Sequence, residues 1–298
     1  MKTLILLSFF LLVSFLPSCN NTSAESTEVK VSQVVPPETS TVNKYSWSSD
    51  YQIKNALINR ISVPEGYERI TEEPGSFADW LRFEPLIEGN PRVHLYNGEE
   101  KRNQTVHHSV VNIDVGSKDL QQCADAIMRM RAEYLYSKKE FDKLHFNFTS
   151  GHSIGFKKWS EGYRTVIKGN DVNWVKKAGK DDSYKVFRAY CDVIFNYAGT
   201  SSLSKELKPV PSLSEMKTGD VFIVGGFPGH AVLVTDMCIN KKTGKKLFLL
   251  QQSYMPAQEI HILKNYNDPA LSPWYHQDFT GDLKTPEWTF SKDQLKRF

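Results

Sequence analysis

The chain has 298 residues, of which 37 are Lys or Arg and 34 are Asp or Glu, so its formal net charge at pH 7 is +3. The basic residues alternate with acidic ones as on ordinary solvated surfaces, and we expect no nucleic-acid partner. No repeat or second linker interrupts the long C-terminal part, which predicts one domain.

A leader segment opens the chain. Lys2 precedes a predominantly apolar run over 4–16, too short to span a bilayer as a permanent helix, and the pattern predicts a secretory signal peptide over 1–18. The segment ends in a small residue followed by Cys19, which resembles the lipobox of bacterial lipoproteins. The resemblance implies that Cys19 is acylated and anchors an exported protein to the bacterial cell envelope, with the outer membrane favoured. The alternative is an ordinary signal with an incidental cysteine.

A tether and a domain follow the leader. Residues 19–45 are rich in Ser, Thr, Glu, Val and Pro and show no periodicity, a composition that cannot bury a core. We therefore expect the lipidated cysteine to be followed by a flexible tether. Over 46–298 helix and strand patterns follow one another, and we expect a single α+β domain.

The first half of the domain contains its clearest helix. Ser76 begins a capping-box pattern before a short helix, and residues 105–115 alternate like a strand. A long helix is predicted over 117–137, capped by Ser117, with Cys123 on or beside its buried stripe.

The second half predicts a hairpin over 163–175, a helix over 183–198 and a group of strands. Two apolar strands, 221–224 and 231–234, flank a Gly/Pro-rich loop, and His230 stands where the second strand begins. The glycines before His230 are expected to leave room for a substrate. Further strands are expected over 247–254 and 259–263, before an aromatic tail with a short helical end.

Three cysteines remain if Cys19 is acylated. An odd number in an exported protein leaves at least one thiol unpaired, and such a thiol is a candidate reactive group. Cys191 lies mid-helix and Cys238 at a strand end, so we expect both to be structural. Cys238 shares a strand face with His230 by alternation but lies about 26 Å away along an extended strand.

Cys123 and His230 can form a nucleophile and base. A thiol with a pKa of about 8.5 is only slightly ionised at neutral pH, and a nearby imidazole and helix N-terminus lower that pKa. Cys123 lies about six residues past Ser117, where the helix dipole has largely faded, so a start nearer Gln122 would serve it better. The alternatives are a small buried core residue for Cys123 and a satisfied core or loop histidine for His230.

The order of these segments resembles a known group of enzymes. A helix with an early cysteine, the strand after Gly219, the Gly-rich loop, His230 and a further strand are similar to papain-like cell-wall hydrolases, the NlpC-type and CHAP-type amidases and endopeptidases. The resemblance implies a papain-like core, with an antiparallel sheet packed against helices, here with additional N-terminal strands and hairpins. It also implies that Cys123 is the nucleophile, that His230 is its base, and that a polar residue on the next strand orients the imidazole.

A second resemblance covers most of the mature chain. Segments 119–136, 219–237 and 252–263, together with the lipobox, resemble a family of bacterial lipoproteins described as a domain of unknown function. This resemblance implies no activity.

Three residues are candidates for orienting His230. If a tight turn is centred on 243–244, residue numbers of paired positions sum to about 487, and the register favours Gln258. The resemblance favours Gln252. A larger loop or a bulge would change the register, so Ser253 also stays open.

Other site types are less well supported. His107 and His108 are neighbours on a strand and point to opposite faces, and no compact ligand spacing occurs, so we expect no metal and no other cofactor. Gly225-Gly226 lacks the ending of a phosphate-binding loop. The aromatic side chains that could stack on sugars, but that we expect in the core, are Trp80, Trp159, Trp174, Trp274 and Tyr275.

The sequence therefore predicts a lipid-anchored cell-envelope protein that is a cysteine-dependent amidase or peptidase acting on peptidoglycan-type amide bonds. Its expected partners are a membrane, through the lipid, and a peptidoglycan or peptide substrate. The alternative is a catalytically inactive binding or scaffold lipoprotein of the same fold. Nothing in the sequence indicates the oligomeric state.

Overall fold

The structure is a computed structural model that describes residues 44–298. The predicted signal peptide, Cys19 and most of the predicted tether lie outside the described residues. The described part belongs to one unit, Val42–Phe298.

Short helices and many short strands make up the described residues. The α-helices are α1 (Leu57–Arg60), α2 (Phe77–Arg82), α3 (Cys123–Ser137), α4 (Phe156–Ser160), α5 (Tyr184–Tyr197) and α6 (Thr200–Glu206). The 3-10 helices are η1 (Ile53–Asn55), η2 (Leu213–Glu215) and η3 (Lys292–Gln294). The strands are β1 (Glu68–Arg69), β2 (His107–Val110), β3 (His145–Asn147), β4 (Ser153–Gly155), β5 (Tyr163–Lys168), β6 (Asp171–Lys176), β7 (Lys208–Pro209), β8 (Val221–Val224), β9 (His230–Ile239), β10 (Lys246–Gln252), β11 (His261–Leu263), β12 (Tyr275–His276), β13 (Leu283–Lys284), β14 (Thr289–Phe290) and β15 (Leu295–Arg297).

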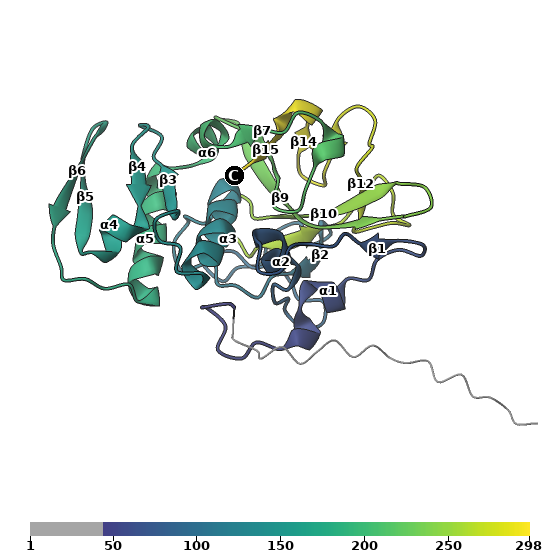
Figure 1. The fold of residues 1–298 in the computed structure, drawn as a ribbon, viewed down its shortest axis with the longest axis horizontal. Coiled ribbons are helices and arrows are strands. Elements are labelled where there is room, and N and C mark those ends of the chain that lie inside the picture. The colour runs from purple at the N-terminus through teal and green to yellow at the C-terminus, as the bar shows by residue number, and fades with distance from the viewer. Residues whose placement is uncertain (1–43) are drawn as a thin grey trace, which may run out of the picture. The chain divides into compact units, whose positions relative to one another are not determined.

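A nine-stranded sheet organises the described residues. Its strand order is β2-β11-β10-β9-β8-β15-β7, with β1 paired to β9 and β12 paired to β10. All of its strand pairs are antiparallel. In Figure 1, α3 lies near the centre of the view between this sheet and the β5–β6 hairpin. The architecture is α+β, with a large antiparallel sheet and a few helices, and the sequence prediction is confirmed at that level.

Strand β9 is buried on both faces. Ala231 and Leu233 pack in the core that includes α3 and α5, whereas Val232 and Val234 pack in a second core with Phe290 of the C-terminal segment. Because both faces are covered, most positions of β9 are apolar, as expected of a buried strand, and its polar residues are His230, Thr235 and Asp236. The main sheet therefore carries helices on one face and the C-terminal segment on the other.

Several elements begin where local chemistry predicts. Ser76 Oγ accepts a hydrogen bond from the Asp79 N–H at 3.1 Å and caps α2. Ser183 Oγ accepts from the Val186 N–H at 3.4 Å and caps α5. The hairpin predicted over 163–175 is β5–β6. The predicted Ser76 cap, the helix over 183–198 and the hairpin are thus confirmed.

Two other elements differ from expectation. Helix α6, which follows α5 almost directly, was not predicted; the N–H of its N-cap, Gly199, donates to Ser202 Oγ at 3.0 Å. The C-terminal tail, expected to end as a helix, has only one 3-10 turn before β15 inserts between β8 and β7. Leu295 of β15 is fully buried, so this strand is held by tertiary packing that its own short sequence does not reveal.

Candidate functional site

Helix α3 begins at Cys123, and the expected start at Ser117 is wrong. Its N-cap is Gln122. The reason lies in Asp119, which was expected in the first helical turn but has its Oδ1 bound by the Ala257 N–H at 2.7 Å. This contact holds the segment before the helix as a loop against the connection between β10 and β11.

Cys123 therefore occupies the first helical position, where the helix dipole acts most strongly. The N–H groups of Cys123, Ala124 and Ala231 of β9 all favour its thiolate. Burial nevertheless raises the pKa of Cys123 to about 11, and Asp125 adds to the rise. The expected lowering of this pKa is wrong, because the loss of hydration outweighs the N–H groups, and the thiol is protonated at neutral pH.

His230 is the first residue of β9 and is 1 % exposed. Its ring centroid lies 4.8 Å from that of Tyr254, 5.3 Å from that of Trp288 and 5.9 Å from that of Phe290. Burial in this aromatic setting lowers the pKa of His230 to about 4. The imidazole is therefore neutral at pH 7.

Cys123 and His230 line the same cavity, which has a volume of about 430 Å³. Its walls come from the loop before α3, the start of α6, the Gly/Pro-rich loop after β8, the end of β10 and Trp288. Phe227 and Met255 also line it and are 93 % and 57 % exposed. A cavity of this size matches the usual range of small-ligand sites.

Gly226 and Gly229, before His230, line this cavity, and the glycines of this loop have a second role that was not expected. A Cβ at Gly229 would lie 2.4 Å from the Gly226 oxygen and 2.6 Å from Thr200 Oγ1, and a Cβ at Gly225 would lie 2.8 Å from the side chain of α6 residue 204. Thr200 Oγ1 also donates to the Gly226 oxygen at 3.0 Å. The glycines thus allow this loop to pack closely on α6, which forms one wall of the cavity.

The pairing of β9 with β10 differs from the expected register. The turn is wider than a tight turn, because pairing begins with Lys246 opposite the last residue of β9. A β-bulge then leaves Thr235 unpaired and shifts the register by one more residue. Extending the Gln251–Leu233 pairing along both strands places residue 254 opposite residue 230, where we expected 257. Because of the bulge, Cys238 packs in the core that includes α3 and α5, whereas Val232 and Val234 pack in the second core with Phe290.

Gln252 is the candidate that contacts His230. Its Oε1 lies 2.9 Å from His230 Nε2, a diagonal contact between neighbouring strands. Ser253 Oγ instead lies 3.0 Å from the Gln121 carbonyl oxygen and 2.8 Å from the Gln258 carbonyl oxygen, either of which can accept its single proton. Gln258 Nε2 donates to the backbone of its own loop at 2.9 Å, and the register that favoured Gln258 is wrong. The catalytic role of Gln252 stays a prediction.

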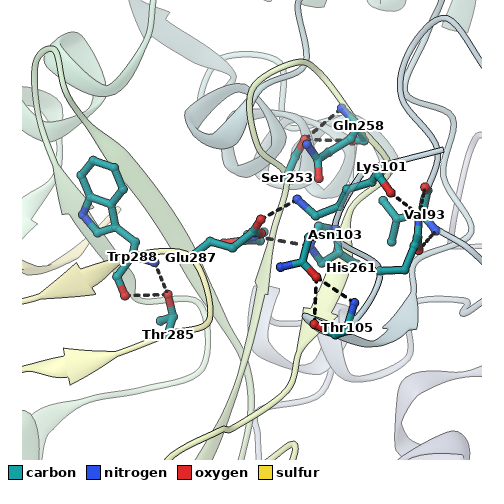
Figure 2. Close-up of polar contacts among 12 residues, drawn as sticks. Val93, Lys101, Asn103, Thr105, Ser253, Gln258, His261, Thr285, Glu287 and Trp288 are labelled. Carbon is teal, nitrogen blue, oxygen red and sulfur yellow. Dashed lines mark hydrogen bonds and ion pairs between the residues drawn. The ribbon is translucent and has the colours of Figure 1, made fainter. Parts of the chain in front are cut away.

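Behind Gln252 lies a buried network that sequence reasoning missed. Gln252 Nε2 donates to Glu287 Oε2 at 2.7 Å and lies 3.3 Å from His261 Nε2. Glu287 Oε1 forms an ion pair with Lys101 Nζ at 2.7 Å, which Figure 2 shows beside His261. His261 donates from Nδ1 to the Glu259 carbonyl oxygen at 2.8 Å. No short-range pattern links these positions, so only the folded chain brings them together.

Comparison with known proteins identifies the family. A domain described as Domain of unknown function (4846) matches residues 57–297. The chain belongs to this family. No curated protein and no solved structure matches it. The predicted domain of unknown function is thus confirmed, whereas the lipoprotein and papain-like resemblances stay proposals.

Residues 44–298 also contain Cys191 and Cys238, which do not line this cavity. Cys191 and Cys238 are buried free thiols whose pKa burial raises to about 12. No group of three or more His, Cys, Asp or Glu residues in this range can hold a metal ion. No helix in the same range is long and apolar enough to cross a membrane. Four of the aromatic residues considered for sugar stacking are buried in the core: Trp80, Trp159, Trp274 and Tyr275.

Proposed function

We propose that this member of the Domain of unknown function (4846) family is a cysteine-dependent amidase or peptidase with a papain-like core. One observation carries the proposal, the hydrogen bond between His230 Nε2 and Gln252 Oε1 at 2.9 Å. A carboxamide oxygen can only accept, so Nε2 carries the proton and Nδ1 keeps its lone pair. That lone pair has no hydrogen-bond partner within residues 44–298, and its ring shares a cavity with Cys123.

The proposed reaction uses these groups in sequence. His230 Nδ1 takes the proton of Cys123 as Sγ attacks the carbonyl carbon of an amide, and the imidazolium then gives that proton to the leaving nitrogen as the C–N bond breaks. His230 next takes a proton from a water molecule that attacks the thioester, which releases the carboxylic acid and restores the thiol. The N–H groups at the start of α3 are suited to stabilise the negative oxygen of each tetrahedral intermediate.

The resting pair is neutral in this proposal. The Cys123 thiol holds its proton because burial raises its pKa to about 11, and His230 stays uncharged because burial lowers its pKa to about 4. Proton transfer between them creates two opposite charges at once, and their attraction offsets part of the burial cost that each charge carries alone. The enzyme would therefore ionise its thiol during the reaction and not before it.

We propose that the protein is located in the cell envelope and that its substrate lies there too. The support is the resemblance of the leader to a lipobox, with Cys19 as the lipidated residue, and of the segment order to cell-wall hydrolases. On this basis the substrate is a peptidoglycan-type peptide amide, and the protein is anchored to the envelope membrane through its lipid.

One observation favours a second candidate function. A protonated thiol and a neutral imidazole, each held so by burial, are also what a binding protein with an inactive site would contain. In that case the cavity would bind a cell-wall peptide without cleaving it.

A hydrolysis assay separates the two functions. Purified wild-type protein and the variants Cys123→Ala, His230→Ala and His152→Ala would be incubated with peptidoglycan fragments, and new amino groups would be counted. We expect release by wild type and by His152→Ala, which changes an exposed histidine, and at least about a hundredfold less by the other two. Equal release by all four would contradict the site assignment. Binding of fragments without release by any of them would favour the second function.

A further inference from the structure

The proposed reaction needs one orientation of the Gln252 side chain. The two ends of a carboxamide have nearly the same shape, but one accepts and the other donates hydrogen bonds. With the oxygen toward His230, the imidazole carries its proton on Nε2 and leaves Nδ1 free. With the nitrogen toward His230, the favoured tautomer carries the proton on Nδ1, and Nδ1 cannot take a proton from Cys123.

Two acceptors fix the nitrogen end of Gln252 away from His230. The Glu287 carboxylate can only accept, and its Oε2 lies 2.7 Å from Gln252 Nε2. His261 donates its Nδ1 proton to the Glu259 carbonyl oxygen at 2.8 Å, so His261 Nε2 is unprotonated and can accept. This Nε2 lies 3.3 Å from Gln252 Nε2 and is the second acceptor. The amide nitrogen has two hydrogens and two acceptors, which leaves the oxygen for His230.

Glu287 is itself held in place from two sides. Lys101 Nζ lies 2.7 Å from Glu287 Oε1, and the two side chains are only 7 % and 15 % exposed. On the other side Glu287 belongs to a turn in which Thr285 N–H donates to the Trp288 oxygen at 2.8 Å and Trp288 N–H donates to Thr285 Oγ1 at 3.1 Å. The Trp288 ring also lies beside His230. Figure 2 shows this turn and the Lys101–Glu287 pair together.

We propose that Glu287, held by Lys101, is a positioning residue that sets the Gln252 amide and through it the reactive tautomer of His230. The inference rests on the proposed function, because a tautomer with a free Nδ1 matters only if Nδ1 acts as a base. Glu287 touches neither Cys123 nor His230 by a hydrogen bond within residues 44–298. Its action is therefore indirect, through Gln252.

The tautomer of His230 can be measured without a substrate. Long-range ¹H–¹⁵N correlation spectra of the ¹⁵N-labelled protein distinguish a protonated from an unprotonated ring nitrogen, and the His230→Gln variant assigns the signals. In wild type we expect Nε2 protonated and Nδ1 unprotonated. In Glu287→Ala we expect the tautomer protonated on Nδ1 to become populated, because only the 3.3 Å contact with His261 then holds the amide nitrogen away from the ring.

Two further variants separate positioning from general damage. Glu287→Gln keeps an oxygen that can accept from Gln252, so we expect it to retain most of the wild-type tautomer. Glu100→Ala removes an exposed carboxylate on the residue before Lys101, which pairs with Arg92. We expect no change in the His230 signals of this variant. A wild-type protein with the proton on Nδ1, or a folded Glu287→Ala protein with wild-type signals, would overturn the inference. The wild-type spectrum tests it even if the alanine variant does not fold, and a wild-type tautomer as expected with no hydrolysis would count against the proposed function alone.

Discussion

The two ends of strand β9 both bury polar groups, but they do so in opposite ways. At the end away from the cavity, Asp236 is fully buried and accepts from Arg69 Nε at 2.7 Å and from Arg82 Nε at 2.9 Å. At the other end, His230 is almost as buried and has one neutral hydrogen-bond partner, Gln252. One end is closed by charge pairing, and the other keeps a lone pair free beside a cavity.

The closed end neutralises its charges internally. Besides its two arginines, Asp236 accepts from the Met237 N–H at 2.9 Å. Nearby Glu84 accepts from Thr235 Oγ1 at 3.0 Å, and burial raises its pKa to about 8, so it is protonated at neutral pH. Arg82 Nη2 also lies 3.6 Å from a carboxylate oxygen of Glu72, so the two arginines face two carboxylates, and this end of the strand is best explained as part of the framework.

At the open end, the buried ion pair contacts Gln252 and makes no hydrogen bond to His230 within residues 44–298. The Lys101–Glu287 pair lies behind Gln252, and the two groups proposed to react, the Cys123 thiol and the His230 ring, are neutral at rest. The comparison shows that burial alone does not mark a reactive site. A buried group that could react is one whose partner leaves an atom free, as Gln252 does for His230.

The largest effect is expected from breaking the closed end. Asp236→Ala leaves the guanidinium groups of Arg69 and Arg82 buried without their carboxylate, and we expect the free energy of unfolding to fall by about 3 to 5 kcal/mol, toward the upper end of that range. Urea denaturation measures this change. The matched control is Glu100→Ala, which breaks an exposed ion pair with Arg92 and should leave the urea midpoint unchanged. A midpoint for Asp236→Ala close to that of the control would show that the charge pairing does not hold this end.

A smaller effect is expected at the open end, and it depends on pH. The pKa of His230 is about 4 in the folded protein and about 6.5 when unfolded, so between these values the unfolded chain binds more protons and stability falls as the pH falls. Between pH 7 and pH 4 we expect this residue to cost the folded state about 3 kcal/mol.

The variant His230→Gln should lack this part of the acid destabilisation in urea titrations at a series of pH values. His261, whose pKa burial lowers to about 3, still titrates in both proteins, so the difference isolates His230. His152→Gln, a change at an exposed histidine, serves as the control and should follow the wild-type curve. A parallel loss of stability in wild type and His230→Gln would mean that His230 is not held neutral by burial.

The sequence predicted much of this framework because local rules decide it. Strand 221–224, the hairpin over 163–175, the helix over 183–198 and the cap Ser76 follow from residue patterns that do not depend on distant parts of the chain. The nucleophile and base candidates, Cys123 and His230, were also found in advance, and the structure brings them to one cavity.

The rest of the site depends on contacts between distant residues. Helix α3 starts late because Asp119 binds the backbone of Ala257, and the register of β10 depends on a bulge at Thr235. Glu287 reaches Gln252 from the C-terminal segment, which on local evidence was expected to end as a helix. Burial also reversed the expected direction of the thiol pKa, because the extent of burial is a property of the folded chain.

The most direct test of the account is the rate at which iodoacetamide alkylates Cys123 at pH 7 in wild type and in His230→Gln, followed by peptide mass spectrometry. If His230 takes the proton of the partly buried Cys123 thiol, the variant should react about a hundredfold more slowly, while the fully buried Cys191 and Cys238 should stay unlabelled in both proteins. Equal rates of Cys123 alkylation in the two proteins would contradict the claim that these residues act as a nucleophile and its base.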